Sequence, residues 1–139
     1  MSDLDTALRC AETMRVNDRS SKMLGISVEV TAPGEAIARM AVRDDMVNGF
    51  DVLHGGLTFA LADTAFAFAC NAYNKRSFAA SAHINFLRPA LRGDKLTALA
   101  TEDHCGRRSG FYSVRVSNQR GELVALFRGR SAVTGESLT

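Results

Sequence analysis

Hydrophobic and polar positions repeat with different periods along the chain, and each period predicts a different element. Near the start, apolar residues recur at the spacing of an amphipathic helix that Ser2 or Asp3 can cap: Leu4, Ala7, Leu8, Ala11 and Met14. The stretch LGISVEVTAPGEAIARMAVR then alternates, which predicts two strands around a turn at Pro33-Gly34. The loop DDMVNGFDVL leads from these strands into the centre of the chain.

The central segment, HGGLTFALADTAFAFACNA, is rich in alanine and phenylalanine and contains no proline, which predicts a long buried helix. Four more strands are expected after it, separated by turn-rich stretches, around residues 77–88, 95–104, 110–118 and 122–134. This order predicts an α+β fold in one domain, residues 1–139. An antiparallel sheet of about six strands would wrap around the central helix, and a short N-terminal helix would precede both.

The charge balance argues against nucleic acid as a partner. The 17 lysines and arginines exceed the 15 aspartates and glutamates by only two, and the basic residues are mostly scattered. Two small basic groups occur, one at Arg107-Arg108 and one at Arg128 and Arg130. Because guanidinium groups bind phosphate oxygens well, such groups suit a compact phosphorylated ligand better than a polyanion.

The cysteines and the N-terminal residues indicate the cellular compartment in which the protein is expected. Cys10, Cys70 and Cys105 are odd in number and lack CxxC spacing, which argues against a disulfide framework and against a zinc site. The first residues lack the apolar core of a signal peptide, and no run of eighteen uncharged apolar residues occurs. These features predict a protein of the reducing cytoplasm, with no metal site and no membrane span.

Asp63 is the only charged residue between His54 and Ala72. A solvent-facing helix carries several charges, and a purely structural core helix carries none. A lone carboxylate on a buried segment is costly unless it is paired, hydrogen-bonded or used in chemistry. Two interpretations are therefore open: Asp63 caps a neighbouring strand or bonds Thr64 or Asn71, or it takes part in a reaction.

Gly55 and Gly56 lie at the expected start of the helix, where backbone N–H groups lack intrahelical partners. With no side chains to cover them, these groups are open to a carbonyl oxygen, as in an oxyanion hole. The alternative is that the two glycines only permit tight packing of the helix on the sheet.

Asp63 follows Gly55 by eight residues, which places it about 12 Å further along the helix axis. Its carboxylate cannot readily reach an oxyanion held at the start of its own helix. A second copy of the helix, antiparallel across a two-fold axis, would bring the carboxylate of one subunit to the glycines of the other. The open edge or face of a six-stranded sheet also favours a dimer.

Three polar residues near this helix are further candidates. Asn48 and His54 precede it and could bond the same carbonyl oxygen, although turn formation by Asn48 and helix capping by His54 are alternatives. Ser81 shares one face of a predicted strand with His83. The Ser81 hydroxyl could orient a water molecule, or it could be an ordinary strand serine.

Three segments together resemble the PaaI-type hotdog-fold acyl-CoA thioesterases of the phenylacetate pathway: VNGFDVLHGGLTFALADTAFAFACNA, INFLRPALRGDKLTA and VALFRGRS. The specific element is an asparagine followed six residues later by His-Gly-Gly, with an aspartate nine residues after the histidine. The resemblance covers residues Val47 to Ser131. It implies the hotdog fold, built into homodimers and commonly into homotetramers.

The resemblance also implies site roles. Gly55 would donate its N–H to the thioester oxygen, helped by His54 and Asn48, while Asp63 of a second subunit would be the nucleophile or general base. Ser81 would orient a water molecule. The substrate-binding residues would be Gly56 and, on the phosphates of coenzyme A, Arg88, Arg107 and Arg108.

The implied reaction is hydrolysis of an acyl-CoA to the free acid and coenzyme A, without a cofactor. The acyl group would be of the phenylacetyl or hydroxyphenylacetyl type, or of medium length. Phe59, Phe66 and Phe68 could line a pocket for it or could be plain core residues. The alternative functions are a hotdog dehydratase of hydroxyacyl thioesters and a non-catalytic acyl-CoA-binding protein.

Overall fold

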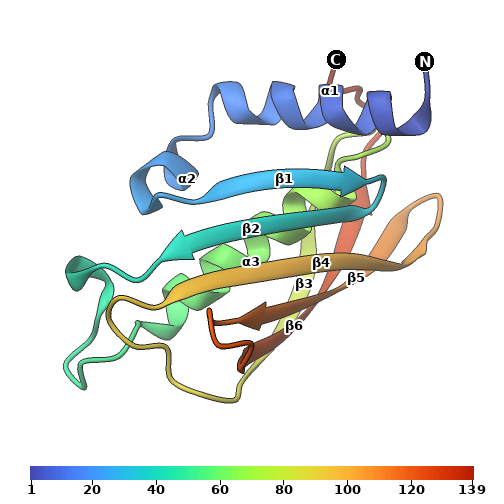
Figure 1. Ribbon diagram of the computed structural model, residues 1–139. Coiled ribbons are helices and arrows are strands. Elements are labelled where there is room, and N and C mark those ends of the chain that lie inside the picture. The colour runs from blue at the N-terminus through green and yellow to red at the C-terminus, as the bar shows by residue number, and fades with distance from the viewer.

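The structure is a computed structural model that describes all 139 residues. A six-stranded antiparallel sheet covers one long helix, α3, which runs behind the sheet in Figure 1. The helices are α1 (Asp3–Val16), α2 (Arg19–Leu24) and α3 (Gly55–Cys70), with a short 3-10 turn η1 (Asp44–Met46). The strands are β1 (Ser27–Ala32), β2 (Glu35–Ala41), β3 (Ser77–Phe86), β4 (Lys95–Cys105), β5 (Ser109–Ser117) and β6 (Leu123–Val133).

The core lies between α3 and the face of the sheet that it covers. Phe66 of α3 is 1% exposed and packs its ring against those of Tyr112 on β5 and Phe127 on β6. Gly129 on β6 faces the Phe66 ring, and a Cβ atom on Gly129 would lie 2.9 Å from it. Glycine is therefore needed at this point of β6, because any side chain would push the helix away from the sheet.

Local capping sets where the two N-terminal helices begin and end. Ser2 caps α1 with its hydroxyl on the Asp5 N–H, and the Asp5 carboxylate accepts a bond from the Ser2 N–H in return. Asp18 caps α2 by accepting a bond from the Ser21 N–H, and Gly25 ends this helix at φ +70°. The sequence pattern did not predict α2, because its six residues, RSSKML, show no apolar period.

The predicted fold class is confirmed. Each of the four strands expected after the central helix is present, with its ends within two residues of the predicted ones. The two strands before α3 form the expected hairpin, and Gly34 turns between them at φ +80°. The strands lie in the order β1-β2-β4-β5-β6-β3, so β1 and β3 are the two edges of the sheet.

The two edges differ in what covers them. Helix α1 lies along β1 in Figure 1, and Arg15 of this helix donates a 2.7 Å hydrogen bond to the Val28 carbonyl on the strand. Strand β3 has no such cover within the chain, and Phe78 and Phe86 on it are 58% and 55% exposed. A long uncovered edge with exposed aromatic rings is a surface on which another chain can add a strand.

No helix in the structure combines the length and the apolar character that crossing a bilayer requires.

Candidate active site

The start of α3 offers one free backbone donor. His54 caps the helix: its Nδ1 accepts a 2.9 Å bond from the Gly56 N–H, and its carbonyl accepts one from the Leu57 N–H. The Gly55 N–H precedes the helical bonding pattern and donates to no other atom of the chain. It borders a cavity of about 330 Å³ that Thr58 of α3, Phe86 and Leu87 also line.

Both glycines at this start have close neighbours. A Cβ atom on Gly55 would lie 3.2 Å from the Phe86 ring on β3, and one on Gly56 would lie 3.0 Å from Nδ1 of the capping residue His54. The interpretation of the Gly-Gly pair as packing of the helix on the sheet therefore fits Gly55, whereas Gly56 makes room for the His54 cap. This packing does not compete with an oxyanion role, because the free donor is the backbone of Gly55.

Asn48 and His54 hold the loop that leads into α3. The Asn48 Oδ1 accepts bonds from the N–H groups of Phe50 and Val52, at 2.9 and 3.4 Å. Because His54 Nδ1 is an acceptor, its proton is assigned to Nε2, which is exposed and free to donate. Each residue thus keeps one donor group, Nδ2 of Asn48 and Nε2 of His54, beyond its structural role.

Asp63 lies on a half-buried face of α3 without a hydrogen-bonding or charged partner in the chain. The structural partners that the sequence allowed are engaged elsewhere. Thr64 donates its hydroxyl to the Ala60 carbonyl at 2.7 Å, and the Asn71 amide bonds Ser77 and Ala67. Burial raises the pKa of the Asp63 carboxyl above its ordinary value of 3.8. An unpaired carboxylate of this kind is typical of a functional site.

Asp63 borders a second cavity, of about 360 Å³, which shares no lining residue with the cavity beside Gly55. The two groups lie on one helix and are about 12 Å apart along its axis. A single chain therefore does not bring the carboxylate and the free N–H together.

Ser81 lies on the sheet face away from α3. It pairs with Arg130 across the strands, and its Oγ accepts a 3.4 Å bond from the Arg130 Nε. The neighbouring Gly129 position points to Phe66 and the core, so alternation directs Arg130 and Ser81 outward. Within one chain Ser81 and Asp63 are on opposite sides of the sheet.

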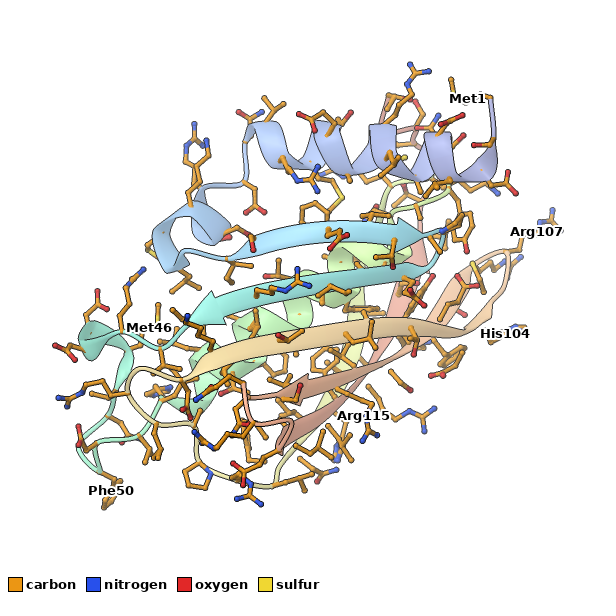
Figure 2. All side chains as sticks on the ribbon, viewed as in Figure 1. Met1, Met46, Phe50, His104, Arg107 and Arg115 are labelled. Atoms are coloured by element: carbon orange, nitrogen blue, oxygen red, sulfur yellow. The ribbon has the colours of Figure 1, made fainter.

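The three candidate arginines are at two ends of the molecule. Arg107 and Arg108 are exposed in the turn between β4 and β5, and Figure 2 shows Arg107 at the opposite end of the sheet from Phe50, in the loop before α3. Arg88 follows β3, lines the cavity beside Gly55 and forms a 3.0 Å ion pair with Glu122. Within one chain, Arg88 lies near the start of α3, whereas Arg107 and Arg108 do not.

The phenylalanines and the central cysteine belong mainly to the core. Phe66 and Phe68 are buried, and Phe59 packs edge-on against Phe127 with ring centres 5.3 Å apart. Burial raises the pKa of the Cys70 thiol to about 12, so this sulfur is not a thiolate nucleophile at neutral pH.

Sequence reasoning missed the N-terminal part of the Asp63 cavity. Met14, Asp18 and Ser20, from the end of α1 and the start of α2, line it together with α3. No motif marks these residues, since their place beside Asp63 depends on how α1 packs against the rest of the molecule.

Comparison with known proteins decides the family. The sequence model described as "Thioesterase superfamily" matches residues 50–125, which include Gly55 and Asp63. The chain belongs to the thioesterase superfamily. It is 43% identical to the acyl-coenzyme A thioesterase PaaI of Escherichia coli over 93% of this chain and 92% of that protein. Human acyl-coenzyme A thioesterase 13 is 31% identical over 75% of this chain and 77% of its own length.

Solved structures agree with this assignment. The structure of the Escherichia coli PaaI protein matches with a TM-score of 0.95 and 42% identity, covering 98% of this chain and 99% of that one. A Streptococcus mutans protein bound to acetyl CoA matches with a TM-score of 0.77 and 26% identity, over 81% of this chain and 90% of its own. The predicted PaaI-type hotdog-fold thioesterase is confirmed.

The unpaired charge of Asp63 predicts the pH dependence of this thioesterase's stability. Because the pKa of Asp63 is higher in the folded state, the folded protein binds more protons between the two pKa values, and stability falls as pH rises through that window. Asp63→Asn should therefore raise the melting temperature at pH 7. The gain should shrink as pH falls through the raised pKa toward 3.8, as followed by thermal denaturation in a pH series.

Asp45→Asn is the matched control, and the expected change in its stability at pH 7 has the opposite sign. The Arg43 guanidinium, 3.0 Å away, lowers the pKa of Asp45, so this carboxylate stabilises the fold above its unfolded pKa. The control should lose stability at pH 7. An Asp63→Asn variant that is less stable than wild type at pH 7 would show that the carboxylate has a structural partner.

Proposed function

We propose that this protein is an acyl-CoA thioesterase that hydrolyses its substrate to a carboxylic acid and coenzyme A at a site shared by two subunits. The observation that carries the proposal is the pair of unused groups on α3, the free Gly55 N–H and the unpartnered Asp63 carboxylate. The names of the Escherichia coli and human relatives and the acetyl CoA bound to the Streptococcus mutans protein support the substrate class.

The Gly55 N–H would stabilise the charge that develops on the thioester oxygen. It lies at the positive end of the dipole of a 16-residue helix, and one such donor contributes about 3–4 kcal/mol to catalysis. The free donors of His54 and Asn48 lie on the same loop and could add to this stabilisation. The cavity beside Gly55 gives the carbonyl group room to enter.

Asp63 would supply the attacking oxygen or activate it. As a general base it takes a proton from water while the water oxygen bonds to the carbonyl carbon, and collapse of the tetrahedral intermediate breaks the C–S bond. As a nucleophile its own oxygen forms a mixed anhydride, which water then hydrolyses. In both routes coenzyme A leaves as a thiolate that takes up a proton. Neither step needs a metal ion or cofactor, because a thioester is electrophilic and coenzyme A is a good leaving group.

A homodimer through the β3 edge would complete the site. Antiparallel pairing of β3 with the same strand of a second copy would satisfy its free backbone groups and cover Phe78 and Phe86. It would also place the two α3 helices antiparallel on one continuous sheet. Asp63 of each copy would then lie near the Gly55 of the other, and two such dimers could form a tetramer.

The same antiparallel arrangement suits the arginine candidates. Arg107 and Arg108 lie at the far end of the sheet from the start of α3, so reversal of the second subunit moves its pair toward the first subunit's Gly55. The pair has no acidic partner and is exposed, as phosphate contacts require. The acyl group would be aryl, of the phenylacetyl or hydroxyphenylacetyl type, or of medium length.

Two alternatives are less well supported. A dehydratase would need His54 as an acid–base group. The Nδ1 of His54 already accepts a hydrogen bond from the Gly56 N–H, and the lack of a side chain on Gly56 leaves room for this contact. A non-catalytic acyl-CoA-binding protein has no need of a partly buried carboxylate that raises the free energy of the fold.

Thiol release from a panel of acyl-CoAs tests the proposal. Wild-type protein should hydrolyse at least one of them, and Asp63→Asn should lower kcat by about 10²–10⁴-fold while KM changes little. Gly55→Pro removes the N–H donor at a position that tolerates proline, because it is the first of the helix and His54 before it is extended at ψ 129°. This variant should lose about 10²–10³-fold in kcat.

Gly55→Ala is the matched control for the proline variant. Its Cβ meets the same Phe86 ring, but it keeps the N–H. Equal losses in the alanine and proline variants would assign the effect to packing and reject the oxyanion role. Wild-type turnover by Asp63→Asn would reject the proposed mechanism.

Complementation tests whether the site is shared between subunits. Asp63→Asn and Gly55→Pro should each be inactive alone, but a mixed dimer contains one doubly damaged site and one intact site. Refolding the two together in equal amounts should restore about a quarter of wild-type activity. Verified mixed dimers that stay inactive would place the whole site within one chain.

A further inference from the structure

The cavity beside Asp63 is built from two parts of the chain that are far apart in sequence. Helix α3 contributes Asp63, Ala67 and Phe68, and the N-terminal helices contribute Met14, Asp18 and Ser20. The match to the thioesterase superfamily model begins at residue 50, so the N-terminal part lies outside the region that this model covers. The Escherichia coli PaaI structure matches 98% of this chain, so the N-terminal helices belong to the matched part.

Packing holds the N-terminal part firmly in place. Ala7, Cys10 and Ala11 of α1 are buried, and Arg15 ties the end of the helix to the Val28 carbonyl of β1. The Arg15 guanidinium also lies 5.9 Å from the centre of the Phe68 ring, so the end of α1 is fixed to α3 itself. A fixed wall can discriminate between ligands by size, which a mobile one cannot do well.

The lining of the cavity combines apolar and polar side chains. Met14, Ala67 and Phe68 are apolar, whereas Thr64, Ser20 and Asp18 are polar. Asp18 already accepts bonds from both Ser20 and Ser21, in a cap that α2 depends on. An apolar chain that reached this carboxylate would take water away from it without replacing the lost hydrogen bonds.

We propose that the N-terminal helices limit the length of the acyl group that the site accepts. Met14 restricts the bulk of the acyl group in the cavity that Asp63 lines, and Asp18 disfavours acyl chains long enough to reach the Asp18 carboxylate. The inference rests on the proposed function, since the carbonyl carbon must approach Asp63 and the acyl group attached to it must occupy space close by. The cavity, at about 360 Å³, is near the lower end of the range for small-molecule sites, which suits a short or medium acyl group.

The test compares kcat/KM for a series of acyl-CoAs from acetyl to dodecanoyl, with phenylacetyl added. Met14→Ala enlarges the cavity and should raise the preference for longer over shorter acyl groups by about tenfold or more, the discrimination that one or two methylenes provide. Met14→Phe should shift the preference in the opposite direction. Asp18→Asn keeps a good helix cap while removing the charge, and should selectively improve the longest chains.

Thr13→Ala is the matched control. Thr13 precedes Met14 on the same helix, is exposed, and bonds only the Arg9 carbonyl within that helix. Its length profile should equal that of wild type, and all variants should be compared at matched stability by thermal denaturation. Shifted profiles in the Met14 and Asp18 variants, with an unchanged Thr13→Ala, would support the inference.

Failure of this inference is distinguishable from failure of the proposed function. If wild type hydrolyses acyl-CoAs and Asp63→Asn does not, but the Met14 and Asp18 variants keep the wild-type length profile, the length selection is overturned and the catalytic proposal stands. If wild type releases no thiol from any substrate of the panel, the proposed function is overturned and the inference with it.

Discussion

The close packing of α3 against the sheet is the constraint on which the rest of the molecule depends. The ring of Phe66 fills the space between the helix and β6, and it can do so only because Gly129 has no side chain. This contact fixes both the axis of α3 and its rotation about that axis. The rotation decides which residues are buried and which remain accessible: Phe66 and Leu61 face the core, whereas Asp63 and Thr64 face outward.

Two groups on the fixed helix are left without partners, and both suit the hydrolysis of a thioester. Capping by His54 satisfies the Gly56 N–H and leaves that of Gly55 free. Burial of the flank of α3 raises the pKa of Asp63 without giving it a partner. The same packing that stabilises the fold therefore leaves a donor and a carboxylate unpaired on one helix, and their separation along it is the reason for proposing a site shared by two chains.

Much of the fold follows from the sequence because β2, β4, β5 and β6 each bury one face. Alternation marks β5 and β6 clearly, since residues such as Val114 and Val116 turn inward while Arg115 between them turns outward. Helix α2 could not be predicted in this way, because capping by Asp18 and the turn at Gly25 define it rather than a periodic apolar face.

The residues of the candidate site also fall into two groups, those that the sequence marks and those whose role only the structure shows. Asp63 and Gly55 stand out in the sequence because a lone charge and a glycine pair are unusual on a buried helix. The structural roles of Asn48 and His54 were open until their hydrogen bonds were known. Met14 could not be assigned to the site at all, since only the docking of α1 on β1 and α3 brings it beside Asp63.

The central claim is that one reacting carbonyl lies between the Gly55 of one subunit and the Asp63 of another. A crystal structure with a ketone analogue of the substrate, in which a methylene replaces the thioester sulfur, measures this directly. The account predicts the analogue oxygen about 3 Å from the Gly55 nitrogen and its carbonyl carbon facing the Asp63 carboxylate of the second subunit. An analogue held by groups of a single chain, or with its oxygen away from Gly55, would contradict the account.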